Sequence, residues 1–171
     1  MAEPIQDIIK RSVLAAEGRY YRLVLLVGAT GSGKSAVLLS IAEELGISVI
    51  NVNLSLSREL LELTAKQRSL RLPGILDCMA EDSTSLLVMD DLEILFDKSL
   101  KQDPLRLLQG ISRNRTVIAS WNGTYTEGRL LYAELGHHEY RSYDAVDALI
   151  VGMDGMATVD SAINNNEARQ K

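Results

Sequence analysis

The sequence predicts an α/β domain in which a parallel sheet of five strands is covered by helices on both faces. Three observations support this fold class. Strand-like apolar runs alternate with helix-like segments along the chain, which is typical of βαβ units. The strand-like runs are apolar almost throughout, as in sheets that are buried on both faces. Right-handed crossovers between such strands then give a doubly wound, three-layer domain.

The first part of the chain contains two expected helices and two expected strands. They are, in order, a helix over about Pro4–Ala16, a strand over Tyr20–Val27, a helix from Lys34 to about Leu45 and a strand over Ser48–Asn53. The apolar residues of the first helix recur at helical spacing. Gly18 and Gly46 end the two helices, because glycine adopts the left-handed conformation common at helix C-termini.

The middle of the chain is expected to be mainly helical around one buried strand. Its elements are a helix capped by Ser57 that ends before Pro73, a helical turn or two over Ile75–Glu81, a strand over Ser85–Asp91 and a helix started by Asp103-Pro104. An aspartate followed by proline is a strong start signal, since aspartate caps the free N–H groups and proline fits the first turn.

The last part of the chain is expected to complete the sheet. Its elements are a strand over Thr116–Trp121 that ends in Asn122-Gly123, a short helix over Arg129–Glu134 and a fifth strand over Glu139–Tyr143. Residues 144–160 fit either a helix or a last strand with a turn at Gly152–Gly155. The polar stretch from about Ser161 predicts a disordered tail over 161–171, which leaves a single domain over 1–160.

Composition narrows the class of protein. The chain has 171 residues, of which 46% are hydrophobic and 24% charged, the balance of one soluble domain. Its net charge of −5 argues against a surface that generally coats nucleic acid. The apolar runs are too short to span a bilayer, and the N-terminus lacks a signal peptide's pattern. We therefore expect a cytoplasmic protein without membrane contact. The lone Cys78 is expected to be a small buried hydrophobe.

A phosphate-binding motif follows the first expected strand. Residues Gly28–Ser35 read Gly-Ala-Thr-Gly-Ser-Gly-Lys-Ser and satisfy G-x4-G-K-[ST]. The glycines let successive backbone N–H groups point at phosphates. Lys34 is expected to reach the outer phosphates and the Ser35 hydroxyl to ligate Mg²⁺. The predicted cofactors are ATP and Mg²⁺, and the predicted binding residues are Gly28, Thr30, Gly31, Ser32, Gly33, Lys34, Ser35 and Ala36.

Carboxylates follow the third expected strand. Four apolar residues end in Asp90, which is expected to hold Mg²⁺ at the carboxyl edge of the sheet. Asp91 is the first candidate for the base that polarises the attacking water, although ATPases of the additional-strand class often have glutamate there. Because a base must reach its water, the shorter Asp91 is a working base, a slow base or only a charge, and Glu93 competes with it.

A polar residue at the end of the fourth expected strand could position water. Asn122 and Ser120 are the candidates, and Asn122 lies nearer the strand end. The alternative is that Asn122-Gly123 is simply a turn. Trp121 is expected to pack in the core rather than to contact a ligand.

One part of the site is expected from a neighbouring subunit. A cation on the transferring phosphate is usually needed, and an arginine from another copy can supply it. If the chain resembles AAA+ ATPases in the order of its elements, this arginine follows the fourth strand, which points to Arg129 or Arg141. Arg113 and Arg115 precede the strand and are the next candidates.

Six further segments carry a family resemblance. They are Asn51–Ser57, Gln102–Leu108, Ser112–Thr116, Ser120–Gly123, Tyr132–Glu134 and His138–Arg141. Together with the phosphate-binding motif, they resemble the BrxF family, the small P-loop proteins of type 3 BREX (bacteriophage exclusion) systems in bacteria. The resemblance covers residues 5 to 151.

The resemblance implies a compact AAA+-like P-loop ATPase that works with other BREX proteins, among them a DNA methyltransferase, a phosphatase-like protein and a larger ATPase. It places Gly33, Lys34, Ser35 and Asp90 in the nucleotide site. Two departures weaken stronger claims: Asp91 replaces the usual glutamate, and little or no helical lid is expected after the sheet.

Three functions are open at this point. The first is a Mg²⁺-dependent ATPase that forms a homo-oligomer and remodels a protein or DNA partner. The second is a scaffold that binds ATP with negligible hydrolysis, and a small-molecule kinase is a weaker third. DNA contact would use local basic clusters despite the acidic total: Lys66, Arg68 and Arg71, and Arg113 with Arg115.

Overall fold

The computed structural model describes residues 3–81, 86–133 and 136–160. In chain order its elements are α1 (Ile5–Ala16), β1 (Leu23–Gly28), α2 (Lys34–Leu45), β2 (Val49–Asn51), α3 (Val52–Leu60), α4 (Ala65–Glu81), β3 (Leu86–Asp90), the 3₁₀ helices η1 (Glu93–Phe96) and η2 (Lys98–Leu100), α5 (Pro104–Ile111), β4 (Thr116–Thr126), β5 (Arg129–Tyr132), β6 (Arg141–Asp144) and β7 (Leu149–Gly152). The expected tail over 161–171 lies outside the described residues.

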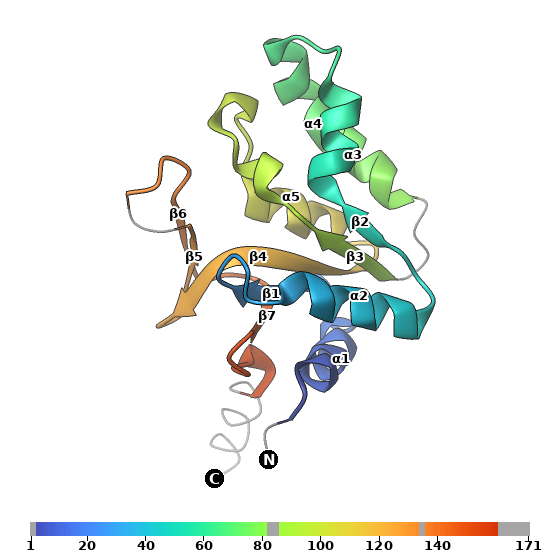
Figure 1. Ribbon diagram of the computed structural model, residues 1–171, viewed down its shortest axis with the longest axis vertical. Coiled ribbons are helices and arrows are strands. Elements are labelled where there is room, and N and C mark those ends of the chain that lie inside the picture. Colours follow the sequence, from blue (N-terminus) through green and yellow to red (C-terminus); the bar gives the residue numbers. More distant parts are fainter. Residues whose placement is uncertain (1–2, 82–85, 134–135, 161–171) are drawn as a thin grey trace.

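Five parallel strands form the central sheet in the order β2-β3-β4-β1-β7 (Figure 1). The parallel five-stranded sheet is thus confirmed, but its fifth strand is β7. The expected strand over Glu139–Tyr143 does form in part, as β6 (Arg141–Asp144), but it pairs with β5 and not with the central sheet. The strand-and-turn alternative for residues 144–160 is correct, since the Gly155 N–H donates to the Gly152 carbonyl at 3.0 Å. β4 lies between β1 and β3, so the ends of all three strands meet at one edge.

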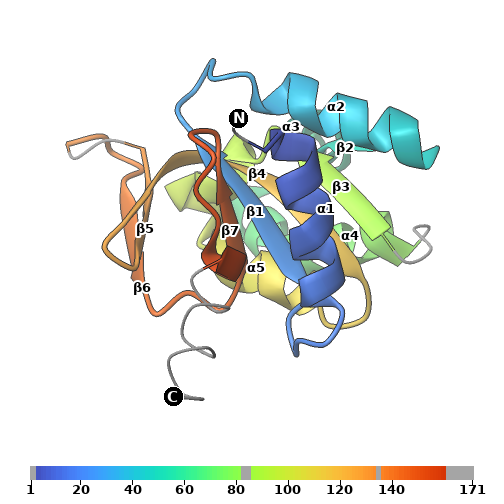
Figure 2. The same cartoon turned by 90° about the horizontal axis from the view of Figure 1, so that it is seen from below.

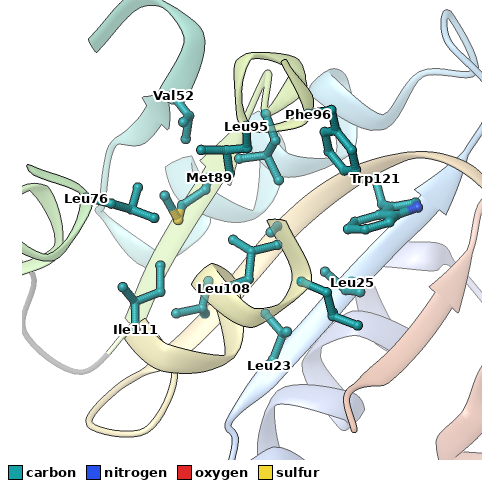
Figure 3. Close-up of a cluster of buried hydrophobic side chains, with 14 of the residues drawn as sticks. Leu23, Leu25, Val52, Leu76, Met89, Leu95, Phe96, Leu108, Ile111 and Trp121 are labelled. Carbon is teal, nitrogen blue, oxygen red and sulfur yellow. The ribbon is translucent and has the colours of Figure 1, made fainter. Parts of the chain in front are cut away.

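Helices cover both faces of the sheet and confirm the three layers (Figures 1 and 2). Along β1, Leu23 and Leu25 join the core beneath α3, α4 and α5, whereas Val24 and Leu26 join the core beneath α1 and α2. Figure 3 shows the first of these cores, with Trp121 packed at one end of it. Successive strand side chains point to opposite faces, so near-continuous apolar strands require this double covering.

The last residues of β4 leave the central sheet and form a separate antiparallel unit. Gly123–Thr126 pairs with β5, and β5 pairs with β6; we call these three strands the β-arm. Figure 1 shows β5 and β6 standing to one side of the central sheet. The expected helix over Arg129–Glu134 is therefore wrong for residues 129–132, and Glu134 lies outside the described residues. Exposed and buried side chains alternate along β5, the pattern of a strand with one covered face.

The helices between β2 and β3 differ from the expected ones. Ser57 lies inside α3 and caps nothing, because Asn51 caps this helix and its Oδ1 accepts from the Leu54 N–H at 2.9 Å. Pro73 lies inside α4 and does not end it. Proline leaves the carbonyl four residues earlier without its helical donor, and the Gln102 side chain donates to that Ser69 carbonyl at 2.7 Å.

The lengths of the helices and the exposure of the single cysteine bear on two expectations from composition. None of the helices in residues 3–81, 86–133 and 136–160 is both long and apolar enough to cross a bilayer. Cys78 is exposed, not buried as expected. The buried residues of α4 include Leu76 and Ala80, and a residue midway between them points away from that face.

Replacing Gly123 with alanine should break the junction between the central sheet and the β-arm. A Cβ at this position would lie 1.8 Å from the Leu131 carbonyl oxygen, so the backbone itself would have to move. We expect a loss of about 3 kcal/mol in the free energy of unfolding, measured by urea denaturation. Gly74→Ala is the matched control, because a Cβ there meets nothing within 4 Å. Equal stability of the two variants would contradict the described junction.

Candidate nucleotide-binding site

The glycine-rich loop joins β1 to α2 at the carboxyl edge of the sheet. Gly31 and Gly33 have φ angles of 79° and 98°, which only glycine adopts readily. At Gly28, a Cβ would come within 2.6 Å of Ser32 Oγ and 2.7 Å of Met153 Cγ. The glycines of the motif are thus required by backbone conformation and by close packing, and the loop has the strand before it and the helix after it that the motif needs.

Lys34 points its ammonium group back into this loop. The side chain is only 6% exposed, and Nζ donates to the carbonyl oxygens of Gly28 at 2.9 Å and Ala29 at 2.7 Å. Burial lowers the pKa of Lys34, while the charges of Asp90 and Glu93 oppose that shift. The loop carbonyls therefore hold a buried cation in place at the start of α2.

A cavity of about 330 Å³ brings the expected residues together. Its lining residues are Thr30, Gly31, Gly33, Lys34, Ser35, Asp90, Asp91, Glu93 and Asn122. We call this cavity the nucleotide cleft. The strand register explains the assembly, since Gly28 pairs with Asn122 and Asn51 pairs with Asp90. Gly28, Ser32 and Ala36 were also expected to bind and do not line this cleft.

Asp91 has a constrained backbone and a perturbed carboxyl group. Its φ angle is 53°, a left-handed conformation that aspartate tolerates better than most residues. Asn51 Nδ2 donates to Asp91 Oδ2 at 2.8 Å, and the Asn53 N–H donates to the Asp91 carbonyl at 2.8 Å. Burial raises the pKa of Asp91, and the charges of Asp90 and Glu93 raise it further. A raised pKa makes a carboxylate a better proton acceptor.

Glu93 is held by two side-chain amides. Asn53 Nδ2 donates to Oε2 at 2.8 Å, and Asn122 Nδ2 donates to Oε1. Asn53 Oδ1 in turn accepts from the Ile94 N–H at 2.7 Å. Sequence reasoning assigned no role to Asn53. Its position just after the strand that neighbours the Asp90 strand was the available signal, because neighbouring parallel strands end at the same edge.

The end of β4 supplies Asn122 to the cleft. Asn122 belongs to the strand, so the alternative that Asn122-Gly123 is a turn is wrong. Ser120 is buried two residues earlier and does not line the cleft. Trp121 is 1% exposed and its Nε1 donates to the Leu131 carbonyl at 3.1 Å, which confirms that it packs in the core.

The candidate arginines lie outside the nucleotide cleft of their own chain. Arg129 is exposed on the β-arm and pairs with Asp144 at 2.8 Å. The Arg141 guanidinium donates to the Gln102 carbonyl at 3.1 Å. Arg113 and Arg115 precede β4 and so lie at the opposite edge of the sheet, where Arg113 sits over the Tyr20 ring. None of the four is among the described residues that line the cleft.

Two of the three basic residues of the α4 cluster are exposed, and the third is engaged in a hydrogen bond within the chain. Lys66 and Arg71 are exposed, whereas Arg68 Nε donates to the Leu63 carbonyl at 3.0 Å and so closes the turn before α4. DNA contact through this cluster stays a prediction.

The topology and the cleft together define a class of protein. A glycine-rich phosphate loop after β1, an acidic strand end at β3 and an extra strand between them are the marks of P-loop nucleoside triphosphatases of the additional-strand class. The family described as "ATPase family associated with various cellular activities (AAA)" matches residues 24–120, and the chain belongs to this family. The match begins in β1 and ends in β4, so it contains the phosphate loop, Asp90 and Asp91.

One of the solved structures that match this chain does so only in part. The structure of PCH-2 from C. elegans is 18% identical, with a TM-score of 0.43. The similarity covers 72% of this chain but 37% of that one, so the chain spans just over a third of the length of PCH-2. No curated protein matches this chain.

The residues present fit a magnesium nucleotide, which membership of an ATPase family implies. Backbone amides of the loop and the start of α2 suit phosphate oxygens. The buried Lys34 ammonium adds a positive charge. Ser35 and Asp90 line the same cleft and provide the hydroxyl and carboxylate oxygens that Mg²⁺ prefers.

Proposed function

We propose that this protein is a Mg²⁺-dependent ATPase that acts as an oligomer. One observation carries the proposal: a buried lysine, a serine hydroxyl, two strand-end carboxylates and an asparagine amide line a single cleft at the carboxyl edge of the sheet. Phosphoryl transfer needs mainly positioning and charge stabilisation, and these groups supply both.

The phosphate loop and Lys34 would bind the triphosphate. Nζ now donates to the Gly28 and Ala29 carbonyls, so it is already placed within the loop and needs only a short rearrangement to donate to a phosphate oxygen. Ser35 and Asp90 would hold the metal. The metal would supply positive charge that neutralises the charge developing on the phosphate.

Asp91 would accept the proton of the attacking water. Burial and two neighbouring carboxylates raise its pKa, as a base requires. Glu93 is a weaker candidate, because both of its oxygens already accept amide hydrogen bonds. We assign Glu93 the role of fixing Asn122, whose amide would in turn orient the water.

A neighbouring copy would complete the site. The described lining of the cleft contains Lys34 as its only permanent cation, and phosphoryl transfer commonly uses an added arginine. Arg129 and Arg141 stand on the β-arm, which leaves the sheet at the same edge as the cleft. We propose one of them as the arginine that reaches the next subunit.

The biological setting follows from the family resemblance. The six segments shared with BrxF-like proteins support a role in a bacterial BREX phage-defence complex in the cytoplasm. Its partners there would be other BREX proteins and, through them or directly, DNA. Hydrolysis would remodel or regulate those partners.

Phosphate release from Mg-ATP, measured over a wide range of protein concentration, tests the proposal. Turnover per subunit should rise with concentration as composite sites form between copies, and Arg129→Ala or Arg141→Ala should remove that rise. Constant turnover per subunit would contradict the shared site. Tight ATP binding without turnover at any concentration would leave a nucleotide-dependent scaffold as the function.

A further inference from the structure

A second and larger cavity adjoins the nucleotide cleft. It has a volume of about 710 Å³, within the range of ligand-binding pockets. Its lining residues are Ala29, Thr30, Glu93, Asn122, Gly123, Thr124, Tyr132, Ala133, His137 and Glu139. We call it the arm cavity, because the β-arm and the segment after β5 form most of its wall. Most of that wall follows residue 120, where the match to the AAA family ends.

Tyr132 presents an unused polar group to this cavity. The residue is 6% exposed, and its ring stacks on Phe96 with centroids 3.4 Å apart. Among the described residues its hydroxyl has no hydrogen-bond partner. Burial raises the pKa of Tyr132, and the charges of Glu93 and Glu139 raise it further. Both glutamates line the same cavity as Tyr132. The hydroxyl is not among the fully buried polar atoms that lack a partner in the described residues, so it is the part of Tyr132 that is open to the cavity.

The charge of the lining favours a cation. The described lining contains two carboxylates, Glu93 and Glu139, and neither lysine nor arginine. His137 Nδ1 accepts from the Glu139 N–H at 3.1 Å. His138 Nε2 is 3.6 Å from Glu139 Oε1, too far for a hydrogen bond. Neither carboxylate has a lysine or arginine beside it in the described lining of the arm cavity, and the nearest cation to Glu93 that the site provides is Lys34 of the adjoining nucleotide cleft.

We propose that the arm cavity binds an arginine side chain of a partner polypeptide. A guanidinium group carries five N–H donors in a planar fork, which suits two carboxylates and the threonine hydroxyls at Thr30 and Thr124. The main chain beside such an arginine offers a carbonyl oxygen to the Tyr132 hydroxyl. The cavity is larger than one side chain, so it also has room for the flanking peptide.

The inference deepens the proposed function, because the arm cavity shares Thr30, Glu93 and Asn122 with the nucleotide cleft. The Asn122 amide donates a hydrogen bond to Glu93. A guanidinium group bound to Glu93 would compete with this hydrogen bond. Partner binding would in that way change the position of the proposed water-orienting group. Binding itself can be measured without nucleotide, so its outcome is separate from that of the ATPase proposal.

Trp121 provides the measurement. It is the only tryptophan of the chain, and its ring lies edge-on to Tyr132 with centroids 5.9 Å apart. Its emission should therefore respond when the arm cavity is filled. The probe is the capped peptide Gly-Gly-Arg-Gly-Gly, titrated against the full chain without nucleotide. The control peptide has citrulline in place of arginine, which keeps the shape and removes the charge.

We expect a saturable change in emission with the arginine peptide and none with the citrulline peptide. Glu139→Gln should weaken binding of the arginine peptide by roughly tenfold, as expected for the loss of a hydrogen bond to a charged group. Tyr132→Phe should weaken binding of the same peptide to a smaller extent. Glu127→Gln, an exposed change on the β-arm outside the cavity, should have no effect. Equal binding of the two peptides, no effect of Glu139→Gln, or no saturable response up to about 10 mM peptide would overturn the proposal.

The source of the arginine is a separate result of the same variants. If a second copy of this chain supplies it, sedimentation should show concentration-dependent association that Glu139→Gln weakens. If a different protein supplies it, the wild type and Glu139→Gln should sediment alike while only the wild type binds the arginine peptide tightly.

Discussion

Replacing Lys34 with alanine should lower the turnover of Mg-ATP by at least about 10²-fold, the effect of removing one preorganised donor from a reacting centre. The reason is the position of its ammonium group, which the Gly28 and Ala29 carbonyls hold inside the phosphate loop. The same change should weaken ATP binding, because the charge acts on the ground state as well. Phosphate release and equilibrium binding of ATP are the two measurements.

A matched control separates this effect from general loss of charge. Lys66→Ala removes an exposed lysine that does not line the cleft and should leave turnover unchanged. Burial lowers the pKa of Lys34, which means that keeping it charged costs folding free energy in the ligand-free protein. Lys34→Ala should therefore remain folded in thermal unfolding. Normal turnover in a folded Lys34→Ala variant would contradict the assigned site.

Replacing Asp91 with asparagine should lower turnover by about 10²- to 10⁴-fold, the usual contribution of a positioned base. Asparagine cannot accept the proton of the water, but its oxygen can still accept from Asn51 and its backbone tolerates the left-handed conformation. ATP binding should therefore persist. Single-turnover phosphate release with ATP binding measured in parallel gives the result.

The same variant makes a prediction about stability. The pKa of Asp91 is raised in the folded protein, so its charged form is disfavoured there. This loss of stability is absent at low pH, where the carboxyl is protonated in both states, and it is present at neutral pH. Asp91→Asn should raise Tm at pH 7 by about 1–3 °C and leave it nearly unchanged near pH 3. A lower Tm at pH 7 would contradict the assigned environment.

Glu93→Gln distinguishes the two candidate bases. Glutamine at this position would turn an N–H donor toward the donating amide of Asn53 or Asn122. The amide that loses its acceptor would move, so turnover should fall, but it should not be abolished. If Glu93→Gln abolishes turnover and Asp91→Asn does not, Glu93 is the base and Asp91 is not.

The phosphate loop could be predicted because its chemistry is local. The glycines, Lys34 and Ser35 lie within eight consecutive residues, between a strand and a helix whose periodicities are plain. The parallel sheet and its two helical layers followed from the apolar strands, and the cap at Asp103 is confirmed, since its side chain accepts from the Arg106 N–H. Such features need no long-range contact to be recognised.

The β-arm could not be predicted for the opposite reason. Arg129–Tyr132 is too short for its period to separate strand from helix, and its strand form depends on pairing with Gly123–Thr126 and β6. The fifth strand was misplaced for the same cause: Glu139–Tyr143 has strand-forming residues, but only Leu149–Gly152 is apolar enough to lie beside β1.

The amide contacts to Glu93 also depend on tertiary structure. Asn53 and Asn122 are 69 positions apart in the numbering. Both reach Glu93 because β3 lies between β2 and β4 and the three strands end at one edge. Pro73 illustrates the same limit, since the carbonyl that it frees inside α4 is satisfied by Gln102, which lies far away in the sequence.

The most direct test of the central claim is product formation by the purified chain from Mg-ATP. The account predicts equal amounts of ADP and phosphate, formed only when Mg²⁺ is present and lost in Lys34→Ala. No ATP binding at millimolar nucleotide, or turnover that persists in Lys34→Ala, would contradict it.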